Sequence, residues 1–484
     1  MPASLTGVSQ HPGACALAVR VALAGALATG CAPSLVDNPS RDVRQDLPAQ
    51  FQGGAAPSEA SVATKNWKDF FQSPQLQELI DLALKNNQEL NVRVQEIIIA
   101  QAEVGARRGE YLPRLSAGVG VGVEKVGGET SQGVSDKAHD VPENLGNFEF
   151  GLRASWEVDV WGRLRNAAQA ADYRALASVE ARNFVVTQLV AEIARSYYEL
   201  IALDNQLEVL KKNIQIQTDA LEVVRAEKQA ARVTELAVQR FEAEVLKNRS
   251  RLYELEQERV QAENRINFLV GRYPQPVVRD AAQLKDPLPA TLQAGLPSQL
   301  LENRPDVRRA ELELEAAKLD VSSTKARFFP ALSIEAGVGY NAFNLVHLLA
   351  TPDSLLYNLA GNLTAPLLNR AAIEADYRSA NARQIQAIFE YERTLLQAFT
   401  DVANQLVKFD NLKQSYALRE RQVETLGRSV EVSTVLFQSA RADYMEVLLT
   451  RRDSLDAELE LIETKKTLLQ AMVNLYEALG GGWR

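Results

Sequence analysis

The fold of this chain is decided by the stretch Asn147-Phe-Glu-Phe-Gly-Leu-Arg-Ala-Ser-Trp-Glu-Val-Asp-Val-Trp-Gly-Arg163. Up to Val158 its apolar and polar residues alternate, which is the pattern of a strand with one oily and one wet face. After Gly162 the period becomes helical, and neither Gly nor Pro occurs from Arg163 to Val270. The sequence therefore predicts a strand over 148–158 that leads directly into a long helix.

The long helix has the dimensions of a rod. If it runs from Arg163 to about Gln229, it is roughly 100 Å long at about 1.5 Å per residue. Its apolar positions step by threes and fours, and eight steps from Val186 to Ile214 cover 28 residues, an average of 3.5. That spacing implies left-handed supercoiling against neighbouring helices. A long helix fed by a strand with an oily face suggests a tube attached to a membrane barrel.

Composition narrows the classes of function. The 484 residues include 62 acidic and 53 basic side chains, for a net charge of −9. This acidic balance argues against a general nucleic-acid binder, because phosphate contacts need clustered Lys and Arg. Outside the N-terminus no run of about 18 apolar residues occurs, so a transmembrane helix is not expected, whereas spanning by strands stays possible.

Catalytic or metal-binding chemistry is not expected either. The three histidines are His11, in the N-terminal leader, and His139 and His347, in two predicted loops. No Cys or paired carboxylate accompanies the loop histidines, so neither a metal site nor His-based catalysis is predicted. We expect no enzymatic activity and no cofactor.

The N-terminus has the pattern of a secretory signal over residues 1–30. Leu27-Ala-Thr-Gly-Cys31 resembles a bacterial lipobox, in which the Cys becomes the acylated first residue of the mature chain. Cys31 is therefore the predicted lipidation site, and Ala32 after it resembles lipoproteins sorted to the outer membrane. The alternative is an ordinary secretion signal with an incidental Cys. Residues 31–70 are expected to form a lipidated N-terminal tether, because the segment is polar and rich in Pro.

The second half of the chain repeats the first. Pro113 in Tyr-Leu-Pro-Arg-Leu-Ser corresponds to Pro330 in Phe-Phe-Pro-Ala-Leu-Ser, an offset of 330 − 113 = 217. Near the helix ends, Leu-Val-Gly271 matches Ala-Leu-Gly480, an offset of 480 − 271 = 209. We expect a first repeat over 71–271, a Pro-rich linker over 272–297 and a second repeat over 298–484, each repeat with a helix, a strand hairpin and a long helix pair.

Each repeat is predicted to contain two strands joined by an irregular loop. In the first, short helices over about 75–86 and 89–108 precede strands over 115–123 and 148–158, with a loop over about 125–146. In the second, strands are expected over 332–340 and about 355–367, around a loop over 341–354.

Each long helical stretch is expected to fold back on itself, at 232–235 and at 441–445. The offset places Thr234 opposite Asp443 (443 − 209 = 234), and both residues are good N-caps. Asp443-Tyr-Met-Glu446 is close to a capping box. The alternative is a continuous helix of about 160 Å, since neither turn contains Gly.

Four membrane strands per chain cannot close a barrel, and an open sheet edge in lipid leaves unpaired backbone groups that cost several kcal/mol each. Two chains would supply eight strands and three chains twelve. Eight-stranded barrels are filled by side chains, whereas a wider barrel holds water. The alternative is a soluble sandwich of alternating strands. In a barrel, Gly118, Gly120 and Gly122 are small residues facing a crowded interior, and the wet faces line a lumen with Glu149, Arg153, Glu157, Asp159, Glu335, Asn358 and Asn362.

Two motifs resemble a known family. Leu301-Glu-Asn-Arg304-Pro-Asp-Val-Arg-Arg-Ala-Glu311, continuing to Phe328-Phe-Pro-Ala-Leu-Ser333, resembles the signature of the TolC-like outer-membrane efflux channels. The segment Trp156–Arg163 resembles that family's strand-to-helix junction. With the lipobox, the chain looks most like the lipoprotein branch (NodT/OprM-like) that serves resistance–nodulation–division (RND) pumps.

This resemblance implies a mainly α fold with a small membrane β part. Three chains would complete a twelve-stranded barrel in the outer membrane above an α-helical coiled-coil tunnel through the periplasm. The resemblance also implies two partners besides the homotrimer, a periplasmic adaptor protein and an inner-membrane RND transporter, and no nucleic acid.

The same family closes its periplasmic tip with charged and bulky side chains near the hairpin turns. By resemblance, we expect the tip or gate to include Thr234, Glu235, Asp443, Tyr444, Glu446 and Arg452. Leu449 stands where many relatives have Asp, and Ala231 and Ala440 stand where the family usually has Gly. We hypothesise a gate held by Tyr444 packing and by Glu446/Arg452 pairs. The alternative is that these are ordinary surface charges of a coiled coil.

The expected function is a passive outer-membrane duct of a tripartite efflux pump, which exports small molecules such as drugs and toxic compounds. Two alternatives stay open: the duct of a type I protein secretion system, and a lipid-anchored periplasmic coiled-coil scaffold. A water-filled tube offers little selectivity, so we expect the pump to choose the exported compound.

Overall fold

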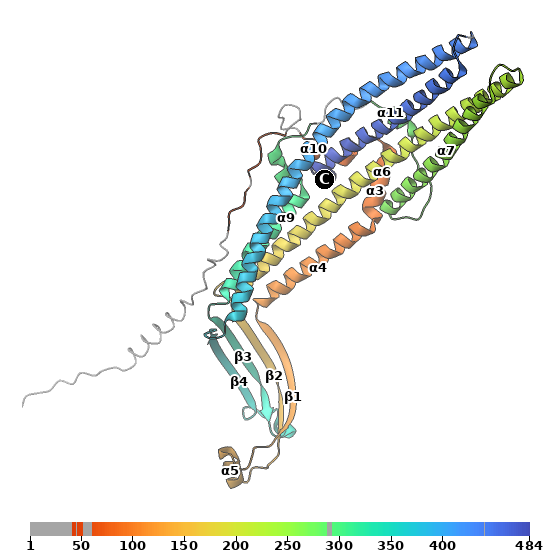
Figure 1. The fold of residues 1–484 in the computed structure, drawn as a ribbon. Helices are drawn as coiled ribbons and strands as arrows, with labels where there is room; N and C mark the ends of the chain where they lie inside the picture. The colour runs from red at the N-terminus through yellow and green to blue at the C-terminus, as the bar shows by residue number, and fades with distance from the viewer. Residues whose placement is uncertain (1–40, 45, 52–60, 288–292, 440) are drawn as a thin grey trace, which may run out of the picture. The chain divides into compact units, whose positions relative to one another are not determined.

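The structure is a computed structural model, and it describes residues 41–44, 46–51, 61–287, 293–439 and 441–484. The predicted signal peptide over 1–30, the predicted lipidation site Cys31 and Ala440 lie outside these residues. Figure 1 shows long helices and one small sheet. In chain order the elements are η1 (Val62–Thr64), α2 (Trp67–Phe70), α3 (Pro74–Asn86), α4 (Gln88–Glu110), β1 (Arg114–Glu124), α5 (Ser131–Ala138), β2 (Leu145–Val158), α6 (Arg163–Gln229), α7 (Glu235–Val270), η2 (Ala281–Lys285), η3 (Pro297–Gln299), α8 (Leu300–Asn303), α9 (Pro305–Ala326), β3 (Ala331–Ala342), η4 (Leu345–His347), β4 (Leu355–Thr364), α10 (Ala371–Gln438) and α11 (Tyr444–Ala478).

Two compact units divide the chain across the sequence repeats rather than between them. One unit takes in Ile98–Leu176 and Leu312–Phe389, besides the N-terminal residues up to Asp42, and so contains the four strands. The other takes in Val43–Ile97, Ala177–Glu311 and Glu390–Arg484, and so contains the helical hairpins. Each unit is therefore built from both repeats. Among the described residues, no helix is long and apolar enough to cross a membrane.

The sheet has the order β1-β2-β3-β4, and every neighbouring pair is antiparallel. Because directly opposed residues share a face, the register tests the predicted alternation. Val119 lies opposite Phe150, which lies opposite Tyr340, so one face is apolar across three strands. The predicted strands are confirmed, except that β4 ends at Thr364 instead of near 367. Pro366, two residues further on, has no N–H to continue a ladder.

The loop after β1 was expected to be irregular but contains a helix, α5. Thr130 caps it by accepting a hydrogen bond from the Gly133 N–H at 3.1 Å. Gly133 packs closely on the preceding turn, since a Cβ there would lie 2.2 Å from the Gly127 carbonyl oxygen. The loop after β3 contains only the short η4 turn among its described residues.

Both long helices fold back, as predicted, so the continuous-helix alternative is wrong. In the first turn the Arg232 N–H donates to the Glu227 carbonyl at 2.9 Å, and in the second the Arg441 N–H donates to the Leu436 carbonyl at 2.9 Å. These are the long-range bonds of a Schellman helix end. Ala231 adopts the left-handed conformation with φ 52°, in which Gly is usual.

The segments predicted as tether and linker are packed where they are described. Phe51 stacks on Phe399 with ring centroids 5.3 Å apart. In the linker, Val277 and Leu284 are buried, and Arg279 donates to the Asp204 carboxylate at 3.0 Å. Pro content predicted a tether and a linker, but it says nothing of the apolar side chains in these segments that reach a neighbouring core, nor of the short helix α2 and the 3-10 turns η1 and η2 that form there.

Candidate functional site: sheet, strand-to-helix junction and hairpin ends

The polar face of the sheet brings together six of the seven predicted lumen residues. Arg153 lies opposite Ser116 and Gly337, and its guanidinium pairs with Glu149 at 3.1 Å. Gly337 lies opposite Asn358 on the next strand. A Cβ on Gly120 would lie 2.7 Å from the Glu149 Cγ, so the small residue leaves room for that carboxylate to cross β1. By the same register Glu157 and Asn362 both lie opposite Ser333, and Glu335 lies opposite Ser155.

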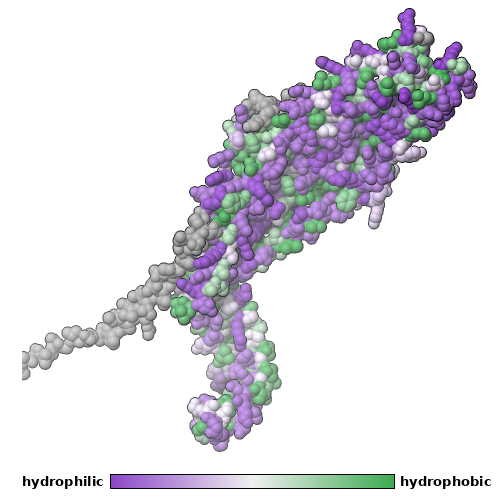
Figure 2. Space-filling model, viewed as in Figure 1, coloured by the Kyte–Doolittle hydropathy of each residue, from purple (hydrophilic) through white to green (hydrophobic). Residues whose placement is uncertain are grey.

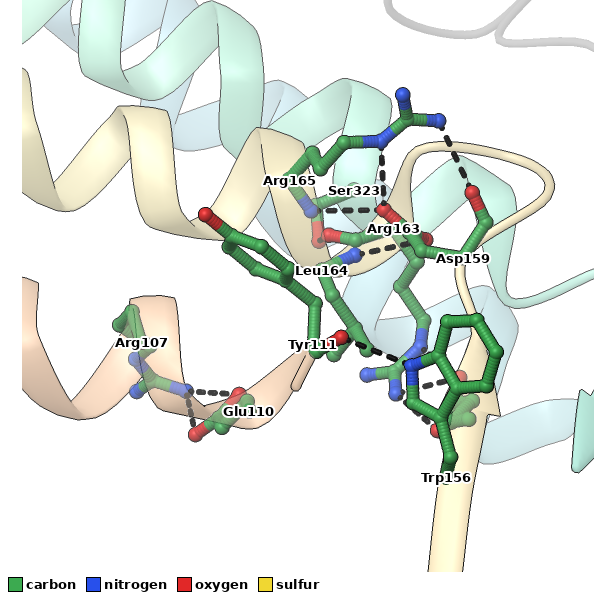
Figure 3. Close-up of polar contacts among 10 residues, drawn as sticks. Arg107, Glu110, Tyr111, Trp156, Asp159, Arg163, Leu164, Arg165 and Ser323 are labelled. Atoms are coloured by element: carbon green, nitrogen blue, oxygen red, sulfur yellow. Dashed lines mark hydrogen bonds and ion pairs between the residues drawn. The ribbon is translucent and has the colours of Figure 1, made fainter. Parts of the chain in front are cut away.

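Asp159 lies beyond the end of β2, so its prediction as a lumen-facing strand residue is corrected. Strand β2 ends at Val158, and the buried Asp159 carboxylate accepts hydrogen bonds from the backbone N–H groups of Leu164 at 3.1 Å and Arg165 at 2.9 Å (Figure 3). Burial tends to raise the pKa of Asp159, but these N–H donors and the Arg165 guanidinium outweigh it and lower the pKa. Asp159 therefore caps the N-terminus of α6, where four N–H groups would otherwise lack partners.

The rest of this junction fixes the angle at which strand becomes helix. The Arg163 guanidinium binds the Glu157 carboxylate at 2.7 Å, and the Ser323 hydroxyl of α9 donates to the Arg163 carbonyl at 2.9 Å. The Trp156 indole N–H donates to the Tyr111 carbonyl at 3.0 Å, tying β2 to the end of α4 (Figure 3). The eight residues from Trp156 to Arg163 thus contain the end of the strand, the helix cap and the Glu157–Arg163 ion pair that links the strand to the helix.

At the hairpin ends, Tyr444 is buried inside the single chain. Its ring packs on Phe437 at 4.4 Å and on Phe241 at 4.6 Å between centroids, and its hydroxyl donates to the Ala220 carbonyl at 3.4 Å. Burial raises the pKa of the Tyr444 phenol. Tyr444 therefore joins the second hairpin to the first.

The other predicted tip residues are placed as follows. Asp443 caps α11 by accepting from the Met445 N–H at 3.3 Å, whereas Thr234, at the corresponding position of α7, makes no side-chain cap bond in the described chain. Glu235 pairs with Lys228 across the first turn. Arg452 pairs with its neighbour Asp453 at 3.0 Å, and among the described residues no ion pair joins it to Glu446.

The signature motif has a structural role that the sequence reading missed. Arg304 lies between α8 and α9 with only 8% of its side chain exposed. It donates to the Ala478 carbonyl at the end of α11 at 2.9 Å and holds the Asp306 carboxylate at 2.6 Å. Gly480, at φ 88°, fits against the Asn303 carbonyl, which a Cβ would approach to 2.4 Å. We call this the Arg304 junction.

The first repeat has an equivalent, the Asn87 junction. Asn87 lies between α3 and α4 and donates to the Leu269 carbonyl at the end of α7 at 2.9 Å. Gly271, at φ 76°, fits against the Asn86 carbonyl, which a Cβ would approach to 2.6 Å. The offsets, 304 − 87 = 217 and 480 − 271 = 209, are those of the internal repeat, which was the signal that could have revealed the pair.

Together these features define a class of protein: a chain that combines a two-faced antiparallel sheet with long paired helices. The sequence matches the family described as outer membrane efflux protein over residues 79–272 and 296–481. The pyoverdine export outer membrane protein OpmQ of Pseudomonas aeruginosa is 31% identical over 439 residues, which is 90% of this chain and 91% of that protein. The cation efflux system protein CusC of Escherichia coli K12 is 28% identical, over 94% of this chain and 97% of CusC.

Solved structures show the same fold. The open state of the MtrE outer membrane channel of Neisseria gonorrhoeae aligns with a TM-score of 0.80 at 25% identity, covering 92% of this chain and 98% of that one. A crystal structure of CusC aligns with a TM-score of 0.78 at 26% identity, covering 92% of this chain and 99% of that one.

The chain belongs to the outer membrane efflux protein family. The predicted family, fold class and outer-membrane location are thereby confirmed. The protein is therefore an outer-membrane efflux channel. The family consists of channels rather than enzymes.

Proposed function

We propose that three copies of this chain form a passive duct that catalyses no reaction and is lined in the membrane by the polar face of the sheet. The observation that carries the proposal is the sheet itself. Its two faces are unlike, and β1 and β4 each pair with only one strand within the described chain. Such edges need partners in lipid, and copies of the same sheet supply them at both ends.

The apolar face supports lipid as its surroundings. It exposes large side chains on outer and inner strands alike, among them Leu115, Val119, Val121, Val123, Leu152, Val338, Tyr357, Leu359 and Leu363. Hydrophobic and polar residues both run along the sheet in Figure 2. A soluble scaffold would leave this apolar surface in water, which disfavours that alternative. A protein-secretion duct would have the same sheet, but the family that the chain matches is described as outer membrane efflux protein.

Assembly and conduction test the proposal together. Purified protein is run on a gel with and without boiling and is then placed in a planar bilayer. We expect a heat-modifiable trimer band and a conducting pore. Charge reversal at Arg153 alone, or at Glu149 alone, is expected to change the ion selectivity of the pore, because both side chains face the lumen in the proposed barrel. A monomer without conductance would contradict the duct.

The gate is a proposal of its own. We propose that Glu446 and Arg452 pair between neighbouring subunits at the hairpin ends, while Tyr444 holds each second hairpin against the first. The burial of Tyr444 between Phe241 and Phe437 supports the second part. Glu446→Ala combined with Arg452→Ala is expected to raise basal conductance and leak of antibiotics into cells.

A matched control comes from the first hairpin. Glu222→Ala with Arg225→Ala removes an exposed ion pair of 2.8 Å on α6, at seven and four residues before the helix ends at Gln229, together with the 3.5 Å pair between Arg225 and Glu242 of α7. This control is expected to leave conductance unchanged. Equal leak from both double variants would mean that loss of surface charge, rather than loss of the gate, opens the pore.

A further inference from the structure

The two loops at the strand ends away from the long helices have opposite character. The loop after β1, residues 125–144, carries Lys125, Glu129, Asp136, Lys137, Asp140 and Glu143. The loop after β3, residues 343–354, has Asp353 as its one charged side chain at neutral pH. It exposes four large apolar side chains instead: Phe343 at 67%, Leu345 at 64%, Val346 at 83% and Leu349 at 70%.

The apolar loop is attached to the apolar side of the sheet. Tyr340 belongs to that face, since its ring stacks on Phe150 with centroids 5.4 Å apart. Its hydroxyl is within hydrogen-bonding distance of the Thr351 hydroxyl, at 3.0 Å. Thr351 of the loop therefore lies at the edge of the surface that the proposed barrel turns toward lipid.

The loop also satisfies backbone groups internally. The Ser354 hydroxyl donates to the His347 carbonyl at 2.7 Å, and the Ser354 N–H donates to the Ala350 carbonyl at 2.8 Å. The Asn341 N–H at the end of β3 donates to the Ser354 carbonyl at 2.8 Å. Backbone that is already hydrogen-bonded can enter an apolar environment at less cost. Its exposed apolar side chains would gain free energy by leaving water.

We infer that the loop after β3 is an interfacial lipid anchor, which inserts Phe343, Leu345, Val346 and Leu349 into the lipid surface next to the sheet. The occupant is lipid because the loop continues the lipid-facing side of the sheet, whereas the charged loop after β1 stays in water. This inference rests on the proposed barrel, which sets which face of the sheet meets lipid.

The test attaches an environment-sensitive fluorophore to single introduced cysteines in the full-length protein. Val346→Cys reports on the loop. Val119→Cys, exposed at 83% on the apolar face of β1, is the lipid reference, and Val134→Cys, exposed at 58% on α5, is the water reference. The proteins are reconstituted in phosphatidylcholine vesicles with and without spin-labelled lipid. Protein without an introduced cysteine, treated with the same fluorophore, gives the background fluorescence.

We expect spin-labelled lipid to quench the fluorophore at 346 about as strongly as at 119, and to leave the fluorophore at 134 unquenched. Quenching at 119 but not at 346 would overturn the lipid anchor and leave the barrel intact. Blue-shifted but unquenched emission at 346 would also overturn it, because a neighbouring subunit would then cover the loop. Absence of quenching at 119 would overturn the proposed barrel instead.

Discussion

The Asn87 and Arg304 junctions share a backbone arrangement and differ in chemistry. In both, a side chain between two helices donates a hydrogen bond to a carbonyl in the last turn of the repeat's final helix. A Gly in the left-handed conformation, just after that helix, packs against the carbonyl of the residue that precedes the donor. The first junction uses one neutral amide. The second uses a buried guanidinium that also holds Asp306 and lies 3.6 Å from Asp401.

The difference separates a requirement of backbone geometry, which both junctions share, from the charge of the donor side chain, which differs between them. The glycines are required at both places, because their φ angles and close carbonyl contacts leave no room for a Cβ. The binding side chain is free to vary as long as it donates to a carbonyl. A charged donor adds strength, but it makes the junction depend on every partner that compensates the buried charge.

The largest effect is expected from Arg304→Ala. The substitution leaves the Ala478 carbonyl and the Asp306 carboxylate without their donor, and breaking a buried pair costs about 4 kcal/mol. Urea unfolding of the detergent-solubilised protein measures the loss. Arg304→Lys keeps the charge but not the two-pronged geometry, so it should lose less. Equal losses in the two variants would show that geometry, not charge, dominates this junction.

Gly480→Ala comes next, with an expected loss of about 3 kcal/mol from the strained φ and the overlap with Asn303. Gly271→Ala should lose a similar amount, because its Cβ would meet the Asn86 carbonyl at 2.6 Å. The control is Gly427→Ala in the interior of α10, where nothing lies within 4 Å and Ala should stabilise by up to about 1 kcal/mol. Tolerance of Ala at 480 but not at 271 would break the equivalence of the two junctions.

Asn87→Ala should have a smaller effect, about 1.5 kcal/mol, because it removes neutral hydrogen bonds only. Asn87 donates to Leu269 and also accepts from the Leu90 N–H at 3.0 Å, which caps α4. Asn87→Asp keeps the cap and removes the donor, so the two variants separate these contributions in the same unfolding measurement. A loss as large as that of Arg304→Ala would contradict the neutral-versus-charged distinction.

The smallest effect is expected at Asp159, a charged anchor that titrates where Arg304 does not. Its pKa is lowered in the folded chain, so its stabilisation is present above the unfolded pKa of about 3.9 and is lost as the pH falls through the folded value. At neutral pH the free energy of unfolding of the wild type should exceed that of Asp159→Asn by about 1 kcal/mol. Urea unfolding over a series of pH values should show this difference shrinking as the pH falls. A gap that is independent of pH would mean that the carboxylate charge contributes nothing.

The sequence predicted local structure well where one period runs unbroken. The alternation before Val158 and the absence of Gly and Pro after Arg163 gave β2 and the start of α6 correctly. Asp159 was misplaced because the alternation continues one residue past the last ladder pair, and only the bonds to Leu164 and Arg165 show that it is a cap. Packing of Tyr444 was expected, but its partner Phe241 on the first hairpin could not be named, because the two residues are remote in sequence.

By itself the sequence determined the elements, the internal repeat and the family, because period, offset and motif are properties of residues near one another or at a fixed spacing. Tertiary structure alone decided which groups meet: Asn87 with Leu269, Arg304 with Ala478, and Tyr340 with the loop after β3. The physical reason is that a hydrogen bond between residues 174 or 182 positions apart depends on how helices pack, and packing leaves no period in the chain.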